Sequence, residues 1–350
     1  LPVTPYDETV ARLYGDGVEY ISLLPGVVEF FRPDVRALLY DASAIAGELR
    51  YEQIHVSPSA IVYERRQREK SPRWTTVAPL GGTRPGSAPS PAPFGGRAAL
   101  ALGSVLVSVD LESGRLDTLF TAPSRLADAA YSPGGTRVAF VATAGGNADV
   151  HVLDLATGTA RAVTTERARD GEPAWDGEGA LLFASDRAGP SEIWRIDLAG
   201  GEPERVTHDG PNGYPAVSPD GRRLAWVRRG SGVAALDRER GVGTRWPSPR
   251  DVVSAPAWSA DGHVIAVAAA AWERVDLYLL AADATRAMRI AYGPSRTTSP
   301  RWLADGRGVL AIAERGGRAS LVAIDGLEAH IARLRAPASA RTLVPAAGER

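Results

Sequence analysis

The segment Pro215–Val227, PAVSPDGRRLAWV, constrains the fold most, because the chain repeats this pattern several times. A short apolar stretch leads into Ser-Pro-Asp-Gly, and a second apolar stretch follows. Proline presets φ early in a turn, aspartate bonds its own backbone, and glycine takes the position where φ is positive. Each copy therefore predicts a tight β-hairpin. The other copies are Ala129–Val141, Pro173–Ala184, Pro256–Val267 and Pro300–Ile312.

The hairpins recur with a regular period. Their turn glycines lie about 41 to 44 residues apart, a spacing in the range of one repeat of a β-propeller. Each hairpin is followed by a third apolar segment and a fourth, for example Glu192–Asp197 and Pro203–His208. Four short strands in each unit are typical of a propeller blade, whose two faces are buried only when blades stack around an axis. The turn glycines are Gly135, Gly179, Gly221, Gly262 and Gly306.

The blade count depends on the N-terminal region. Six copies are clear, if a degenerate one at Pro91–Leu102 is included. Phe30–Tyr40 resembles a further hairpin, and Ala60–Arg66 and Arg73–Pro79 resemble third and fourth strands. We therefore favour seven blades, in an all-β propeller of four-stranded blades. The alternative is six blades, with residues 1–80 forming a separate cap that lends a strand to close the ring.

Five segments follow from these patterns. The strand-like stretch Val18–Leu24 is expected either to lie outside the repeats or to pair with a C-terminal strand and close the ring. The segments are an N-terminal extension or ring-closing strand (1–24), a degenerate first blade or cap (25–80), a Pro/Gly/Ser-rich loop (81–96), the propeller repeats (97–326) and a C-terminal closing segment (327–350).

One position in the repeat is often aromatic. It lies at the end of the first strand of each copy, and it holds Tyr131, Trp175, Val217, Trp258 and Trp302. Large side chains at equivalent positions of successive blades are suited to fill the space between blades. We interpret them as core between blades and not as a surface on which a ligand stacks.

The repeats resemble those of TolB-type propellers, the PD40 group of WD40-like repeats. The resemblance rests on the Ser-Pro-Asp-Gly hairpins, the strand Ile193–Leu198 and the closing strand Gly200–His208, and it covers about residues 85–326. That family includes envelope scaffold proteins and the gating domains of prolyl-oligopeptidase-like enzymes. The resemblance implies a periplasmic or otherwise extracytoplasmic location. The absence of cysteine is compatible with an oxidising compartment.

Composition excludes several classes of function. The net charge is −1, which gives no surface suited to nucleic acid. No apolar run approaches the length of a membrane span. The basic run Glu64–Arg73 is interpreted as a solvated loop, although it could contact lipid headgroups.

No catalytic motif is present. The chain has no Gly-x-Ser-x-Gly nucleophile elbow, no calcium-binding loop and no phosphate-binding glycine loop. Its histidines, scattered over different repeats, have no metal-ligand spacing. We therefore predict that the protein is not an enzyme and that it holds no cofactor or metal. The histidines are His55, His151, His208, His263 and His330.

The function predicted from these observations is protein binding without catalysis. The propeller would act as a scaffold or extrinsic subunit of an envelope or membrane-associated complex, peripheral to the membrane. Two alternatives are an enzyme or small-ligand binder that uses the axial channel, and a subunit that gates a separate hydrolase. Arginines recur just before the repeats, where equivalent positions would ring one channel mouth and bind carboxylates bidentately. They are Arg125, Arg169, Arg250 and Arg296.

Overall fold

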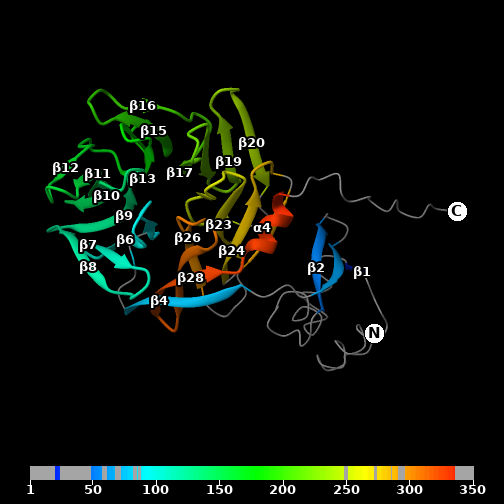
Figure 1. Cartoon of the computed structure of the whole chain (residues 1–350). Coiled ribbons are helices and arrows are strands. Elements are labelled where there is room, and N and C mark those ends of the chain that lie inside the picture. Colours follow the sequence, from blue (N-terminus) through cyan, green and yellow to red (C-terminus); the bar gives the residue numbers. More distant parts are fainter. Residues whose placement is uncertain are drawn as a thin grey trace. The chain divides into compact units, whose positions relative to one another are not determined.

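The chain divides into two compact units, residues 1–71 and 72–350. The computed structural model describes residues 20–23, 49–56, 61–67, 72–81, 85, 88–247, 251–271, 274–284, 286–290 and 296–335. In the first unit the described strands form an antiparallel sheet in the order β1-β3-β2 (Figure 1). These strands are β1 (Tyr20–Leu23), β2 (Leu49–Val56) and β3 (Ile61–Gln67).

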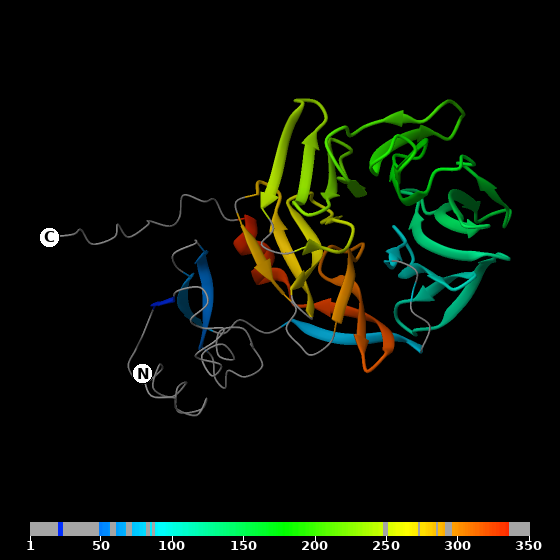
Figure 2. The ribbon, with the colours of Figure 1, turned by 180° about the vertical axis from the view of Figure 1, so that it is seen from behind.

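The second unit is a β-propeller. Its described strands form six antiparallel blades around an axis, and in five of them the strands are consecutive in sequence (Figures 1 and 2). The first blade has β5 (Ser90–Pro91), β6 (Arg97–Leu102), β7 (Val105–Asp110) and β8 (Leu116–Thr121), and the second has β9 (Arg125–Tyr131), β10 (Arg137–Ala144), β11 (Asn147–Asp154) and β12 (Ala160–Ala162). The third has β13 (Asp170–Asp176), β14 (Ala180–Ser185), β15 (Glu192–Asp197) and β16 (Glu204–Arg205).

The fourth and fifth blades follow the same scheme. The fourth has β17 (Asn212–Val217), β18 (Arg223–Arg228), β19 (Gly232–Asp237) and β20 (Val242–Pro247). In the fifth the first strand is in two pieces, β21 (Asp251–Val252) and β22 (Ala257–Trp258), which both pair with β23 (Val264–Ala271). Its remaining strands are β24 (Arg274–Ala281) and β25 (Ala287–Arg289).

The sixth blade closes the ring with a strand from the other end of the propeller. It combines β26 (Arg296–Trp302), β27 (Val309–Arg315) and β28 (Arg318–Asp325) with β4 (Arg73–Gly81). β4 runs antiparallel to β28 (Figure 1). Because this strand precedes the first blade in sequence, pairing it with the last blade joins the two ends of the ring.

These pairings correct two predictions. The structure shows the six-bladed alternative and not the seven blades that we favoured, because β3 and β4 belong to different units instead of to one N-terminal blade. Of the two options for residues 18–24, the closing strand is also contradicted. Its described part, β1, pairs with β3, and β4 closes the ring.

The hairpin turns form as the motif predicts. In the fourth blade the Gly221 N–H donates to the Ser218 carbonyl at 2.8 Å, and Gly221 has φ 73°. The Ser218 hydroxyl accepts the Arg223 N–H at 2.9 Å. In the third blade the turn differs from our alignment, because Gly177 and not Gly179 takes the positive φ.

The recurrent tryptophans lie between blades, as predicted. Trp175, Trp258 and Trp302 are each buried. Each indole N–H donates to a backbone carbonyl of the preceding blade: Trp175 to Ala130 at 2.8 Å, Trp258 to Ala216 at 3.1 Å and Trp302 to Ala257 at 2.9 Å. The same side chain therefore fills the space between two blades and satisfies a polar group there.

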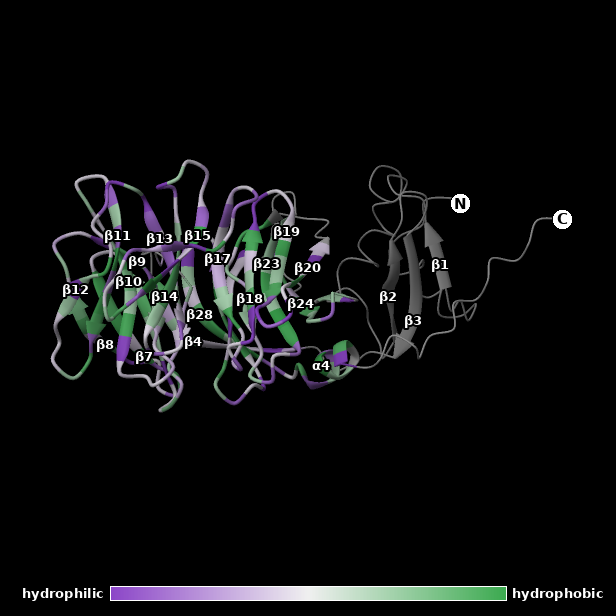
Figure 3. Ribbon diagram, turned by 90° about the horizontal axis from the view of Figure 1, so that it is seen from above, coloured by the Kyte–Doolittle hydropathy of each residue, from purple (hydrophilic) through white to green (hydrophobic). Residues whose placement is uncertain are grey.

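The hydrophobic core is distributed between the blades. Figure 3 shows hydrophobic residues along strands such as β10 and β23. After β28, helix α4 (Glu328–Arg335) packs beside the fifth and sixth blades, where Leu327, Ile331 and Leu334 are buried with Leu277 and Val309. No helix in the described part of the chain is long and apolar enough to cross a membrane.

Candidate binding site in the axial cavity

The first strands of four blades bulge at one equivalent position. The pairing of β9, β13, β17 and β26 with the next strand shifts register at this point. A residue other than glycine adopts the left-handed conformation there in each blade: Asp128 (φ 51°), Glu172 (φ 55°), Tyr214 (φ 53°) and Ser299 (φ 60°). This conformation costs about 1–3 kcal/mol for each residue, and bulges redirect side chains. Because the same conformational cost recurs in four blades, the left-handed residue is a property of the axial site and does not arise from one loop.

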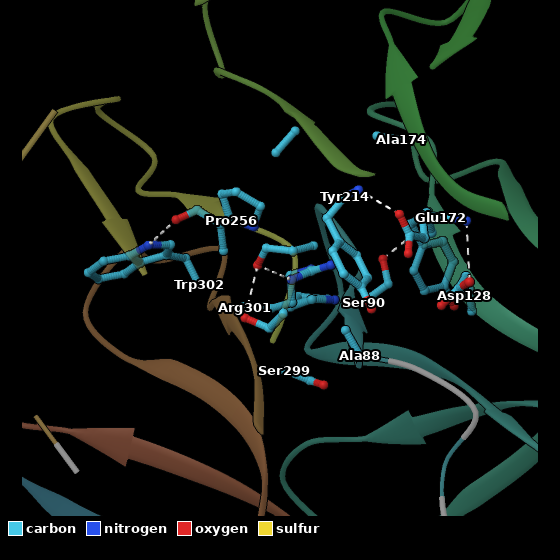
Figure 4. Close-up of a pocket in the computed structure, with 18 of the residues that line it drawn as sticks. Ala88, Ser90, Asp128, Glu172, Ala174, Tyr214, Pro256, Ser299, Arg301 and Trp302 are labelled. Atoms are coloured by element: carbon cyan, nitrogen blue, oxygen red, sulfur yellow. Dashed lines mark hydrogen bonds between the residues drawn. The ribbon is translucent and has the colours of Figure 1, made fainter. Parts of the chain in front are cut away.

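The acidic members of this series link neighbouring blades. Asp128 accepts the Glu172 N–H at 3.3 Å, and Glu172 accepts the Tyr214 N–H at 2.6 Å. The other oxygen of Glu172 forms an ion pair with Arg229 at 3.2 Å. Figure 4 shows the linked residues on one side of the cavity. The carboxylates therefore satisfy backbone donors that the bulges leave unpaired.

The cavity perturbs the titration of these groups. Removal from water raises the pKa of Asp128 to about 6, against the opposing effect of the Glu172 N–H. It raises the pKa of Glu172 to about 7, where the nearby Asp128 charge adds to the effect. It also raises the pKa of Tyr214 to about 12. In each case loss of hydration disfavours the charged form.

A guanidinium stands in the sixth blade, where most other blades carry alanine. In the strand pairing of the six blades, Arg301 occupies the place of Ser90, Ala130, Ala174, Ala216 and Ala257. Its Nη1 donates to the carbonyls of Pro300 at 2.9 Å and Ala255 at 3.3 Å. Loss of hydration lowers the pKa of Arg301 to about 10, a value at which it stays cationic at neutral pH. The axis therefore has an acidic side and a basic side.

These residues line one cavity of about 550 Å³. Such a volume falls in the range of small-molecule and peptide pockets. The walls come from the first strands of all six blades, and they include Ser90, Asp128, Glu172, Tyr214 and Arg301. Proline follows the bulge residue in the third, fourth and sixth blades (Pro173, Pro215, Pro300), and Pro256 stands at the equivalent place of the fifth. The polar groups are therefore set among rigid apolar rings.

The arginines predicted from the sequence lie near the beginning of the first strands and not at the bulge. Arg125, Arg169 and Arg296 each lie six residues before the recurrent aromatic position, and each is exposed. Arg125 and Arg296 begin β9 and β26, and Arg169 directly precedes β13. Of these three, Arg296 lines the cavity. Arg250 lies outside the described residues. The predicted role of these arginines in partner binding stays a prediction.

Other predicted chemistry can be compared with the described residues. Within them, no group of three or more histidine, aspartate and glutamate side chains gathers in a way that could hold a metal ion. His151 stacks on Phe140, and His263 is exposed beside Asp261.

The fold and the site define a six-bladed propeller with a polar axial cavity, and comparison with known proteins identifies its type. A family model described as the TolB beta propeller domain (PD40) matches residues 102–246. A TolB homologue from Chlorobium chlorochromatii is 32% identical over 126 residues, which are 35% of this chain and 28% of that protein. The chain thus spans less than a third of this relative. Residues 102–246 of the propeller thus match the TolB-type propeller with PD40 repeats.

Solved structures agree with this fold. TolB from Acinetobacter baumannii has a TM-score of 0.54 and 23% identity, over 61% of this chain and 56% of its own. A gluconolactonase from Xanthomonas campestris has a TM-score of 0.57 and 14% identity, over 72% of this chain and 89% of its own. At these identities the likeness extends to the fold alone.

The sequence analysis missed the axial residues, although a signal was present. The aligned copies read Pro-Ala-Trp in the third and fifth blades and Pro-Arg-Trp in the sixth, so Arg301 departs visibly from the repeat. Asp128, Glu172 and Tyr214 could not be singled out in the same way, because the residue type at their position differs from one repeat to the next. Only the bulge shows that this position faces the axis.

Proposed function

We propose that the propeller binds a protein partner without catalysing a reaction, and that Arg125, Arg169 and Arg296 form the docking surface around one mouth of the axial cavity. The observation that carries this proposal is their equivalence, because residues at one position of successive repeats fall on a circle around the axis. Each of these arginines is exposed. Guanidinium groups in such an arrangement suit an acidic protein surface, which they can bind bidentately.

The axial carboxylates support a binding role over a catalytic one. A general acid or base must be able to exchange a proton with a substrate. Asp128 and Glu172 instead accept backbone N–H groups of the following blades, and Glu172 also pairs with Arg229. Their contacts therefore serve to hold the inner strands together.

The partner's location is proposed from the resemblance to TolB-type propellers. We place the protein in an extracytoplasmic compartment, as an extrinsic subunit of an envelope or membrane-associated complex. The absence of cysteine is compatible with that compartment. An axial-channel enzyme is the competing proposal, and turnover of a small substrate abolished by Glu172→Gln would favour it.

The test is a charge reversal at the mouth. The variant with Arg125→Glu, Arg169→Glu and Arg296→Glu is purified from the native source beside the wild type, and the proteins that accompany each are compared. We expect the main partner to be lost, with an affinity reduced more than about tenfold, because interfacial charge pairs couple by roughly 2 kcal/mol or more. A triple variant that retains the partner at wild-type affinity would place the interface elsewhere.

A further inference from the structure

The guanidinium of Arg301 has one edge to which no described residue is bonded. Within the described part of the chain it donates two hydrogen bonds, both from Nη1 and both to backbone carbonyls. Among the described residues no carboxylate forms an ion pair with it, and neither Nε nor Nη2 donates a hydrogen bond. The Nε–Nη2 edge is one of the two-donor edges with which arginine binds a carboxylate bidentately.

This edge belongs to the cavity and not to the outer surface. Arg301 is half-buried and lines the axial cavity. In Figure 4 its side chain extends toward Tyr214 and Ser90. The negative charge of Asp128 opposes the loss of hydration that lowers the pKa of Arg301. A cation removed from water gains from an anionic partner, because the attraction is strong where water is excluded.

Two of the acidic groups that line the cavity already have partners of their own. Asp128 is bonded to the Glu172 N–H, and Glu172 is held by the Tyr214 N–H and by Arg229. The repeat adds a second argument, since the equivalent position in four other blades is alanine. The blade scaffold therefore does not require an arginine at this position.

We propose that Arg301 makes the axial cavity a receptor for a carboxylate group. The carboxylate binds side-on to Nε and Nη2, while Nη1 keeps its bonds to Pro300 and Ala255. Its source is either a free organic acid or the carboxylate of a short peptide segment, and the cavity volume of about 550 Å³ admits both.

The experiment measures binding of defined probes to the full chain by calorimetry. The probes are N-acetyl-trialanine with a free carboxylate, the same peptide as its C-terminal amide, and glutarate. The variants are Arg301→Ala, Arg301→Lys and Arg245→Ala. Alanine is the residue at the equivalent position of four other blades, and lysine keeps the positive charge without the two-donor edge of a guanidinium. Arg245, the control, is an exposed arginine of β20 that pairs with Asp209.

We expect the wild type to bind at least one of the two carboxylate probes. If it binds the peptide acid, it should bind the peptide amide at least about tenfold more weakly. Arg301→Ala should weaken carboxylate binding by about tenfold or more without changing amide binding, Arg301→Lys should lie between, and Arg245→Ala should match the wild type. Binding of the peptide acid alone identifies a peptide carboxylate, and binding of glutarate alone identifies a free acid.

Three outcomes would overturn the proposal. They are equal binding of acid and amide, unchanged carboxylate binding by a folded Arg301→Ala, and no binding of any carboxylate probe by the wild type at millimolar concentration. If Arg301 only joins the fifth and sixth blades, Arg301→Ala lowers the melting temperature and leaves binding unchanged. These short probes test the cavity without a partner at the mouth, so this proposal and the proposed docking site can fail separately.

Discussion

The third and sixth blades share their scaffold and differ in what they add to it. In both, a tryptophan donates to a carbonyl of the preceding blade, through Trp175 at 2.8 Å and Trp302 at 2.9 Å. Both also have a left-handed residue at the axis. The third blade carries Glu172 there, whereas the sixth carries Ser299 with Arg301 two residues later. The repeat therefore specifies the backbone, and single departures from it specify the chemistry.

The two blades differ again at their outer edge. The fourth strand of the third blade, β16, has two residues, and neither is fully buried. The fourth strand of the sixth blade, β4, has nine residues, and Ala78 and Leu80 are buried within it. A strand that joins distant parts of the chain must offset a larger loss of chain entropy, and its longer pairing and burial can do so.

The largest effect is therefore expected from a charge on the closing strand. Ala78→Asp places a carboxylate without a partner among Leu100, Leu310 and Leu321. We expect the free energy of unfolding to fall by about 3 kcal/mol or more, measured by urea denaturation. The same substitution at Ala160 on β12, a partly buried outer strand of the second blade, should cost less than about 1 kcal/mol. Equal losses would show that closure by β4 is no more demanding than an ordinary blade edge.

An intermediate effect is expected at the left-handed residue of the sixth blade. Ser299→Val puts a β-branched side chain at φ 60°, which is strongly disfavoured, and should destabilise the protein by about 1–3 kcal/mol. Ser299→Gly meets no such penalty, and we expect it to stay within about 1 kcal/mol of the wild type. Thermal unfolding measures both. Equal melting temperatures for the two variants would contradict a backbone requirement at this position.

The smallest effect concerns the acidic side of the axis and depends on pH. The folded pKa of Asp128 is about 6 and that of Glu172 about 7, both above their ordinary values of 3.8 and 4.5. The folded state therefore binds more protons than the unfolded state between about pH 4 and 7. Lowering the pH through this window should raise the contribution of these groups to stability.

The comparison is between the wild type and a variant with Asp128→Asn and Glu172→Gln. From pH 8 to pH 5.5 the melting temperature of the wild type should rise relative to that of the variant, because the variant lacks both titrations. All other ionisable groups are common to the two proteins, so the difference isolates the axial pair. Parallel pH profiles would mean that the cavity does not perturb these carboxyl groups.

Much of the fold could be predicted from the spacing of turns. The Ser-Pro-Asp-Gly hairpins, the four strands of each blade and the tryptophans between blades are local or strictly periodic features, and they are confirmed. The predicted seventh blade was wrong because β3 and β4 read as neighbouring strands of one hairpin. Nothing local in Arg73–Gly81 shows that its partner is β28, nearly the whole propeller away in sequence.

The axial site divides in the same way. The sequence by itself determined the repeat, the turn chemistry and the presence of one arginine where most copies have alanine, because these are properties of residue type and spacing. Only the tertiary structure decided that Asp128, Glu172, Tyr214 and Arg301 meet in one cavity. The physical reason is that a bulge aims each side chain while ring closure sets the blades around a common axis. Neither the direction of these side chains nor the closure of the ring can be read from the short stretch of sequence around each residue.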